Sequence, residues 1–203
     1  SYNNDTLEDF AGMFRYSKLI EAVNDADTSI LSNITTVKMY KYFTPTLNSG
    51  LKYTLSYNNA LYNPHSGHNS SGGGVISSSG FKVNNDSSLN EHFLDDDGAG
   101  NLRLYYLSGT ARVYTDATYG TVDYATGEVV LTSAHITSIS NIDGASSTQV
   151  RVFATPSSND IVPVRNQVLS IDTSNSTITG EVDGIESGSS QAGTTYTTTS
   201  SYS

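Results

Sequence analysis

The 203-residue sequence contains no cysteine and no tryptophan, and only 15% of its residues are charged. Without cysteine the chain has no disulfide framework, no thiol nucleophile and no thiolate metal site. Hydrophobic residues make up 36% of the chain, which is below the usual share for globular proteins. No apolar run approaches the roughly 18 residues of a membrane-spanning helix. We therefore expect neither a disulfide-stapled fold nor a membrane partner.

Positive charge is also scarce. Ten basic residues face twenty acidic ones, which gives a net charge of −10. The basic residues are scattered along the chain and are Arg15, Lys18, Lys38, Lys41, Lys52, Lys82, Arg103, Arg112, Arg151 and Arg165. A groove that follows a phosphate backbone needs clustered cations. We therefore expect no nucleic-acid partner.

What the sequence has in abundance is small polar residues and tyrosine, of which there are 14. Serine, threonine and asparagine compete with helix hydrogen bonds and favour turns and strands. Tyrosine suits half-exposed sheet surfaces because one end of its ring is polar. This composition argues against an all-helical bundle.

The N-terminal region, residues 1–45, has the only clear helical periodicity. Apolar residues recur at steps of three to four in two short pieces on either side of Arg15-Tyr16-Ser17. From residue 34 the pattern changes to that of a strand, which ends at Pro45. We expect a short helical arm followed by a first strand.

Residues 46–183 favour short antiparallel strands with turn signals about every ten residues. The expected strands cover 51–57, 92–94, 101–107, 112–114, 121–124, 128–131, 150–154, 164–171 and 177–182. Residues 65–80 are expected to form a Gly/Ser loop with an edge strand at 75–76. This pattern predicts a mainly β fold, an antiparallel β-sandwich or partial barrel. Mid-strand cations at Lys52, Arg103, Arg112 and Arg151 are expected to oppose open-ended edge pairing.

The last segment, residues 184–203, is a Ser/Thr/Gly-rich tail. It holds too little apolar surface to offset about 1–2 kcal/mol of backbone entropy per residue. We expect this tail to be held by the chain's own sheet or by a neighbour, as a strand added to an open edge. Its apolar residues Ile185, Tyr196 and Tyr202 are the candidates for that contact.

Two clusters invite a metal interpretation. In Asp95-Asp96-Asp97-Gly98, placing the glycine sixth in a calcium loop puts Phe93 first and Leu104 twelfth, and neither can coordinate the ion. A solvated acidic hairpin tip is therefore the preferred interpretation. His65 and His68 lie three apart but lack a third ligand. His92 and His135 are expected to be satisfied strand histidines, so we expect no metal site and no cofactor.

Catalytic signatures are absent from the sequence. It contains no nucleophile elbow, phosphate-binding loop, dinucleotide fingerprint or HExxH motif. A carboxylate pair of the glycosidase type depends on spatial separation and stays open at this level. No segment concentrates the aromatic and acidic residues of a sugar-cleaving cleft, so we expect no enzyme and no catalytic residue.

Three stretches together resemble a known family. They are FRYSKLI (14–20) with DADTSILSN (25–33), FTP (43–45) leading to YTLSYNN (53–59), and NDIVPVRNQVLSID (159–172). Their order and spacing resemble the C-terminal part of the inner baseplate wedge protein of T-even-like contractile-tail phages, especially those of marine cyanobacteria. The resemblance would cover residues 5 to about 183.

The resemblance implies a structural, non-enzymatic role in the virion tail, with assembly in the host cytoplasm. Such a protein pairs with copies of itself, joins wedges into a ring and contacts other wedge proteins, without a small-molecule substrate. Phe14, Tyr16, Leu19 and Ile20 then become candidates for a packed interface. The bland alternative is that these four side chains cover the β domain of their own chain.

A second function stays open on the residues alone. Sheets rich in tyrosine, serine, threonine and asparagine also build glycan-facing surfaces, so the alternative is a carbohydrate-binding or adhesin-type surface module. Tyr105 and Tyr124 are its candidate residues.

Overall fold

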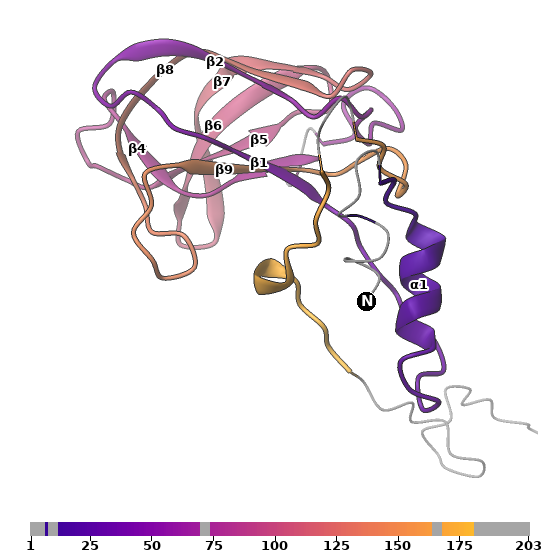
Figure 1. Ribbon diagram of the computed structural model, residues 1–203. Helices are drawn as coiled ribbons and strands as arrows, with labels where there is room; N and C mark the ends of the chain where they lie inside the picture. The colour runs from indigo at the N-terminus through magenta and orange to yellow at the C-terminus, as the bar shows by residue number, and fades with distance from the viewer. Residues whose placement is uncertain (1–6, 8–11, 70–73, 164–167, 181–203) are drawn as a thin grey trace, which may run out of the picture. The chain divides into compact units, whose positions relative to one another are not determined.

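A computed structural model describes residues 7, 12–69, 74–163 and 168–180 of the chain (Figure 1). The described residues are mainly β, with antiparallel sheets, a partial five-stranded barrel and one short N-terminal helix, as the composition predicts. The chain divides into two units, Ser1–Ser170 and Ile171–Ser203. The boundaries after residues 45 and 183 stay predictions.

The first unit contains one helix and nine strands within its described residues. In chain order these are α1 (Tyr16–Asn24), β1 (Met39–Phe43), β2 (Gly50–Ser56), β3 (Ile76–Ser78), β4 (Phe81–Val83), β5 (His92–Asp96), β6 (Asn101–Ser108), β7 (Ala111–Asp123), β8 (Glu128–Ile139) and β9 (Val150–Ala154). The second unit has one described element, the short 3₁₀ turn η2 (Thr173–Asn175).

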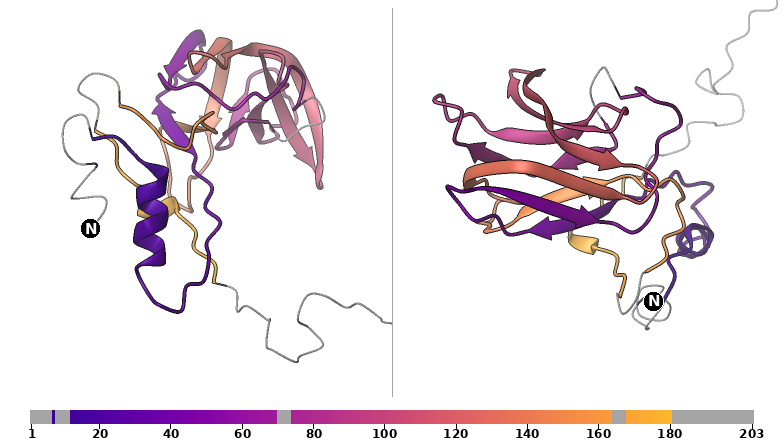
Figure 2. Two further views of the ribbon diagram at one scale, coloured as in Figure 1. Left: turned by 90° about the vertical axis from the view of Figure 1, so that its right-hand side faces the viewer. Right: turned by 90° about the horizontal axis from the view of Figure 1, so that it is seen from above.

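Six strands form one sheet in the order β2-β8-β4-β5-β6-β7, and β7 also pairs with β8. This extra pairing brings the sheet back on itself, so that β4 to β8 make the partial barrel and β2 lies outside β8 (Figures 1 and 2). The other three strands form a separate sheet, β1-β9-β3. Of the two predicted architectures, the structure confirms the partial barrel.

Closure depends on the length of β7. β7 pairs with β6 from Ala111 to Thr121, and its last residues, Gly120 to Asp123, also pair with β8 on the other side. A side chain at Gly120 would collide with the carbonyl group of Val130. The strands can approach this closely only where β7 has no Cβ, which is a common use of glycine inside a strand.

The core lies between the sheets and consists of alternate apolar residues of the strands. Its fully buried side chains include Phe81, Leu94, Leu102, Val129, Leu131, Ile136, Val150 and Val152. Each large aliphatic or aromatic side chain removed from water contributes about 1.5–3 kcal/mol. Alternation was the signal that predicted these strands, and burial of one face is its physical cause.

Two predicted elements differ from the structure. The predicted hairpin of 164–171 and 177–182 is wrong in its described part, because residues 168–180 contain no strand. They contain η2 instead, where the Asp172 carboxylate accepts hydrogen bonds from two backbone N–H groups. Local Asx bonding of this kind competes with strand pairing.

The arm also differs in detail. The second of the two predicted helical pieces is α1. The first lies largely outside the described residues, and its described end, residues 12–14, is not helical. Of the predicted first strand, only the residues of β1 pair with another strand. The alternation of half-buried and exposed residues nevertheless begins earlier, at residue 33. Residues 33–38 therefore have the exposure pattern of a strand without a ladder. No described helix has the length and hydrophobicity needed to span a lipid bilayer.

The predicted solvated acidic tip is wrong. Asp95 and Asp96 belong to β5, and their exposed fractions are only 1% and 0%. Arg103 and Arg151 are buried as well, so these two cations do not act as solvent-facing guards of an edge. Lys52, by contrast, is exposed on the edge strand β2 at a register shift, where such a guard is useful.

Candidate assembly interface

The start of the arm is fixed to a distant loop of the same unit. Phe14 and Ile161 exchange two backbone hydrogen bonds of 2.9 Å each. Next to this bridge, the backbone N–H of Tyr16 donates to Oδ1 of Asp160 over 2.8 Å. Two consecutive points of the arm are thereby tied to residues about 145 positions later.

The Asp160 contact acts as a helix cap. Arg15, the N-cap residue of α1, makes no side-chain capping bond, so the first N–H groups of the helix need another acceptor. The carboxylate of Asp160 provides one for Tyr16, and its negative charge lies at the positive end of the helix dipole. The residue that caps α1 therefore lies 144 positions later in the sequence.

The same loop is held on its other side by Asn59. The Asn59 amide donates to the carbonyl oxygen of Val162 and accepts from the N–H of Val162, both over 3.3 Å. The three stretches that carry the family resemblance thus meet at one place. We call this place the junction, and its residues are Phe14, Tyr16, Asn59, Asp160, Ile161 and Val162.

Beyond the junction the chain follows α1 outward and then returns along it. The Tyr16 hydroxyl donates to the carbonyl oxygen of Thr35 over 3.0 Å. At the far end of the helix, the Asn33 amide donates to Oδ1 of Asn24 over 2.6 Å. Residues 14–38, which we call the arm, are therefore closed by side-chain contacts at both ends, although α1 contains no buried residue.

The returning half of the arm exposes large apolar side chains. Leu31 is 78% exposed and Ile34 is 100% exposed. Tyr42, on β1, continues the exposed positions of the alternation and is 42% exposed. Burial of apolar surface is favourable by about 25 cal/mol per Å². A partner that covered Leu31 and Ile34 would gain this energy without unfolding any part of the chain.

The predicted interface residues are distributed differently. Phe14 is 6% exposed and lies in the junction, where it covers its own chain. Tyr16, Leu19 and Ile20 are half-buried on α1. The three tail candidates lie outside the described residues, and all seven assignments stay predictions; the tail candidates are Ile185, Tyr196 and Tyr202.

Sequence reasoning missed Leu31 and Ile34. In DTSILSNITT, Leu31 follows Ile30 and Ile34 stands between polar residues, so the two do not form an apolar face of clear period. The sequence feature that could have revealed them is their position, between a helix and a segment in which half-buried and exposed residues begin to alternate. A large aliphatic residue at an outward position of such a segment is informative, because the alternation itself places it in solvent.

A second polar cluster lies on the barrel and concerns Asp95. Arg103 donates to both of its carboxylate oxygens, at 2.9 and 3.1 Å, and Arg112 donates to Oδ2 over 2.6 Å. The Tyr114 hydroxyl donates to Oδ2 as well, over 2.8 Å. Burial raises the pKa of Tyr114, and the Asp95 carboxylate raises it further.

Aromatic rings complete this cluster. The Arg103 guanidinium lies 4.3 Å from the ring centroid of Tyr114, and that of Arg112 lies 4.6 Å from the ring centroid of Tyr105. Buried charges persist when they are paired and fully hydrogen-bonded, and Asp95 meets both conditions. The arrangement is that of a structural ion-pair network, in which every oxygen of Asp95 has a donor.

Asp96 is satisfied without a cation. Its Oδ1 accepts from the N–H of Ile76 over 2.7 Å, and its Oδ2 accepts from Asn69 over 2.8 Å and from the Tyr124 hydroxyl over 2.6 Å. The carboxylate thus joins the Gly/Ser loop to the barrel. In the described part of the chain, no three His, Cys, Asp or Glu residues are placed to hold a metal ion.

The histidines differ partly from expectation. His92 is fully buried, and its Nδ1 lies 3.1 Å from the carbonyl oxygen of Asn90. Its Nε2 has no hydrogen-bond partner among the described residues, so the ring is only half satisfied. The rings of His65 and His68 are 5.7 Å apart and edge-to-face.

Comparison with known protein families gives a match in the N-terminal region. The model of the family "Baseplate structural protein gp6, C-terminal domain III" matches residues 1–42, which include the arm and most of β1. No curated protein matches the chain. The match ends at residue 42, so the wider resemblance to residue 183 and its cyanophage character stay predictions. It supports a structural protein of the phage baseplate, in the virion tail, that interacts with other baseplate proteins.

Proposed function

We propose that this chain is a structural component of a contractile-tail baseplate wedge, assembled in the host cytoplasm, and that it acts by self-association and by contacts with other wedge proteins. It does so through the arm. Dimer or ring formation needs no cofactor, no nucleic acid and no reaction at the site. The matched family is one of structural proteins, which agrees with a non-enzymatic role.

One observation carries the proposal: the family match covers the part of the first unit in which large apolar side chains are most exposed. Residues 1–42 are matched, and Leu31 and Ile34 are the two most exposed large hydrophobic side chains described in the first unit. Exposed apolar surface on an anchored element is typical of a protein–protein contact. The junction fixes the arm, which lowers the entropy lost when a partner binds.

The test is a charge placed at the centre of the exposed face. Ile34→Asp is expected to weaken self-association at least tenfold, because an aspartate in an apolar interface must be desolvated without a partner. Leu31→Asp is expected to act in the same direction. Light scattering coupled to gel filtration over a range of protein concentrations measures the effect.

The matched control is Leu89→Asp. Leu89 is a 58% exposed leucine in the loop between β4 and β5, and its φ of 53° suits aspartate. This variant adds the same charge to the barrel and should leave self-association unchanged. A wild-type chain that stays monomeric at every concentration would contradict self-association, and equal effects of all three variants would contradict the role of the arm.

A further inference from the structure

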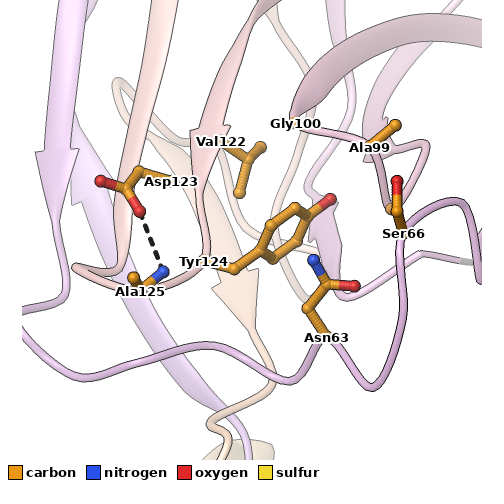
Figure 3. Close-up of a pocket in the computed structure, with 9 residues that line it drawn as sticks. Asn63, Ser66, Ala99, Gly100, Val122, Asp123, Tyr124 and Ala125 are labelled. Atoms are coloured by element: carbon orange, nitrogen blue, oxygen red, sulfur yellow. Dashed lines mark hydrogen bonds between the residues drawn. The ribbon is translucent and has the colours of Figure 1, made fainter.

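The barrel has a small pocket at the end that carries the β5–β6 turn. Its volume is about 410 Å³, and it lies between that turn, the turn after β7 and residues 63–66, where the Gly/Ser loop begins. The side chains that shape it are Asn63, Ser66, Ala99 and Tyr124, together with the backbone of Gly100 (Figure 3). None of these residues belongs to the arm or to the junction.

Tyr124 forms a fixed wall of this pocket. Its hydroxyl donates to Oδ2 of Asp96 over 2.6 Å, and Asp96 is itself held by Asn69 and Ile76. Burial and the Asp96 carboxylate raise the pKa of Tyr124, so the phenol stays neutral and keeps its bond. The ring therefore presents an apolar face in one orientation.

Neutral polar groups surround this ring. In Figure 3 the amide of Asn63 and the hydroxyl of Ser66 lie on the same side of the pocket, with the Ala99–Gly100 turn opposite the ring. The Asn63 Oδ1 atom is shielded from solvent and has no hydrogen-bond partner among the described residues. Rotation about the terminal side-chain bond of asparagine costs little, so this amide can turn to a ligand hydroxyl.

The charges near the pocket select against anions. The Asp123 carboxylate is turned away from the Tyr124 ring toward the N–H groups of Ala125 and Thr126 (Figure 3). The hydrogen bonds from Thr126 and Ala125 lower the pKa of Asp123, so the group is ionised at neutral pH. Among the residues that the structure describes, no lysine or arginine lines the pocket. A phosphate or a carboxylated ligand would meet negative charge without a cation.

We propose that this pocket binds a neutral sugar ring. A hexose has an apolar face that can stack on the fixed Tyr124 ring. Its hydroxyl groups can donate hydrogen bonds to Asn63 and Ser66 and accept hydrogen bonds from them. The volume lies at the lower end of the range of small-molecule sites, which suits one ring and leaves a longer glycan to continue into solvent. This site is separate from the arm, so sugar binding would be a second function beside the proposed role in assembly.

The first experiment is titration of the ¹⁵N-labelled full chain with glucose, galactose, mannose and N-acetylglucosamine, followed by NMR. The expected result is a saturable shift of the backbone amide signals of Asn63, Ala99 and Tyr124 with at least one of these sugars. Inorganic phosphate and N-acetylneuraminic acid are expected to cause none. No shift with any neutral sugar, or a larger shift with either anion, would overturn the proposal.

Variants locate the binding. Asn63→Ala combined with Ser66→Ala is expected to raise the dissociation constant of the best sugar at least tenfold, and Ala99→Leu is expected to abolish binding by filling the pocket. The control is Thr132→Ala, which removes an exposed hydroxyl on β8 and should change nothing. Sugar binding that survives both pocket variants would place the ligand elsewhere and refute the assignment. Self-association is expected to be the same in the wild-type chain and in these three variants. Loss of sugar binding and loss of self-association are therefore separate results, and the two proposals can fail independently.

Discussion

The arm and the barrel of the first unit are built in opposite ways. The barrel buries its apolar residues together with the charges of Asp95, Asp96 and Arg103, and its strands pair over long stretches. The arm has a helix without a buried residue, and it is held by the junction and by side-chain bonds that close it on itself. Global stability therefore resides in the barrel, and the surface proposed for a partner lies where stability is low.

The largest difference is expected from the buried ion pair of the barrel. Arg103→Met leaves the Asp95 carboxylate buried and short of its two-bond partner. Removal of one member of a buried pair costs about 3–5 kcal/mol. Urea denaturation should show this loss in the free energy of unfolding.

Arg112→Met is the matched variant for the same carboxylate. The Arg112 side chain is 33% exposed, against 9% for Arg103, and it gives Asp95 a single hydrogen bond. Its loss should cost clearly less, about 1 kcal/mol. Equal losses for the two variants would show that burial does not set the strength of this network.

The next effect concerns the arm. Asp160→Ala removes the cap of α1, and loss of a helix cap costs about 1 kcal/mol. Because the barrel does not depend on this bond, the change should appear as faster hydrogen exchange of the α1 amides, with the urea midpoint nearly unchanged. Asp116→Ala, which removes a similar turn-capping carboxylate from β7, should leave the exchange of α1 unaltered. If Asp160→Ala instead destabilised the whole fold cooperatively, the stability of the barrel would depend on the arm, contrary to this prediction.

A smaller effect is expected from acid. Burial raises the pKa of Asp97, but hydrogen bonds from Asn101 and Ala99 outweigh it, so the net shift is downward. A carboxyl with a lowered folded-state pKa stabilises the fold above its unfolded pKa of about 3.9 and loses this contribution as pH falls through the folded value. The urea midpoint should therefore decline below about pH 4, and less steeply in Asp97→Asn. A decline of the same slope in both proteins would refute this origin.

The smallest effect is expected where function is proposed. Ile34 is fully exposed, so Ile34→Asp should change the free energy of unfolding of the dilute protein by no more than about 0.5 kcal/mol. Urea denaturation at low concentration measures it. A loss above 2 kcal/mol would mean that this side chain serves the fold of its own chain.

Much of the fold could be predicted from the sequence because strand alternation is local information. The hairpins of β5–β6 and β7–β8 and the strand β9 follow from residues that are neighbours in the chain. The burial of Asp95 and Asp96 could not be predicted in this way. Of their partners, only Arg103 comes from the neighbouring strand of the same hairpin, whereas others come from β7, from Asn69 and from β3. A local pattern of acids and glycine is the same in solvent and in such a closed network.

The candidate site shows the same limit. The helical periodicity correctly predicted α1, and it drew attention to the half-buried Leu19 and Ile20. Leu31 and Ile34 are not part of an apolar face with helical period. Their exposure to solvent depends on how the arm folds back on α1. That return is set by two side-chain hydrogen bonds, which composition and spacing do not encode.

The distance in sequence between Tyr16 and Asp160 has a consequence for biosynthesis. The capping residue is translated 144 positions after the helix that it caps, so the nascent arm leaves the ribosome without its anchor. Phe14 and Tyr16 can dock only when the loop after β9 has emerged, so the arm is anchored late in synthesis. On the proposed function, a half-made chain therefore carries its binding surface without the anchor that fixes it.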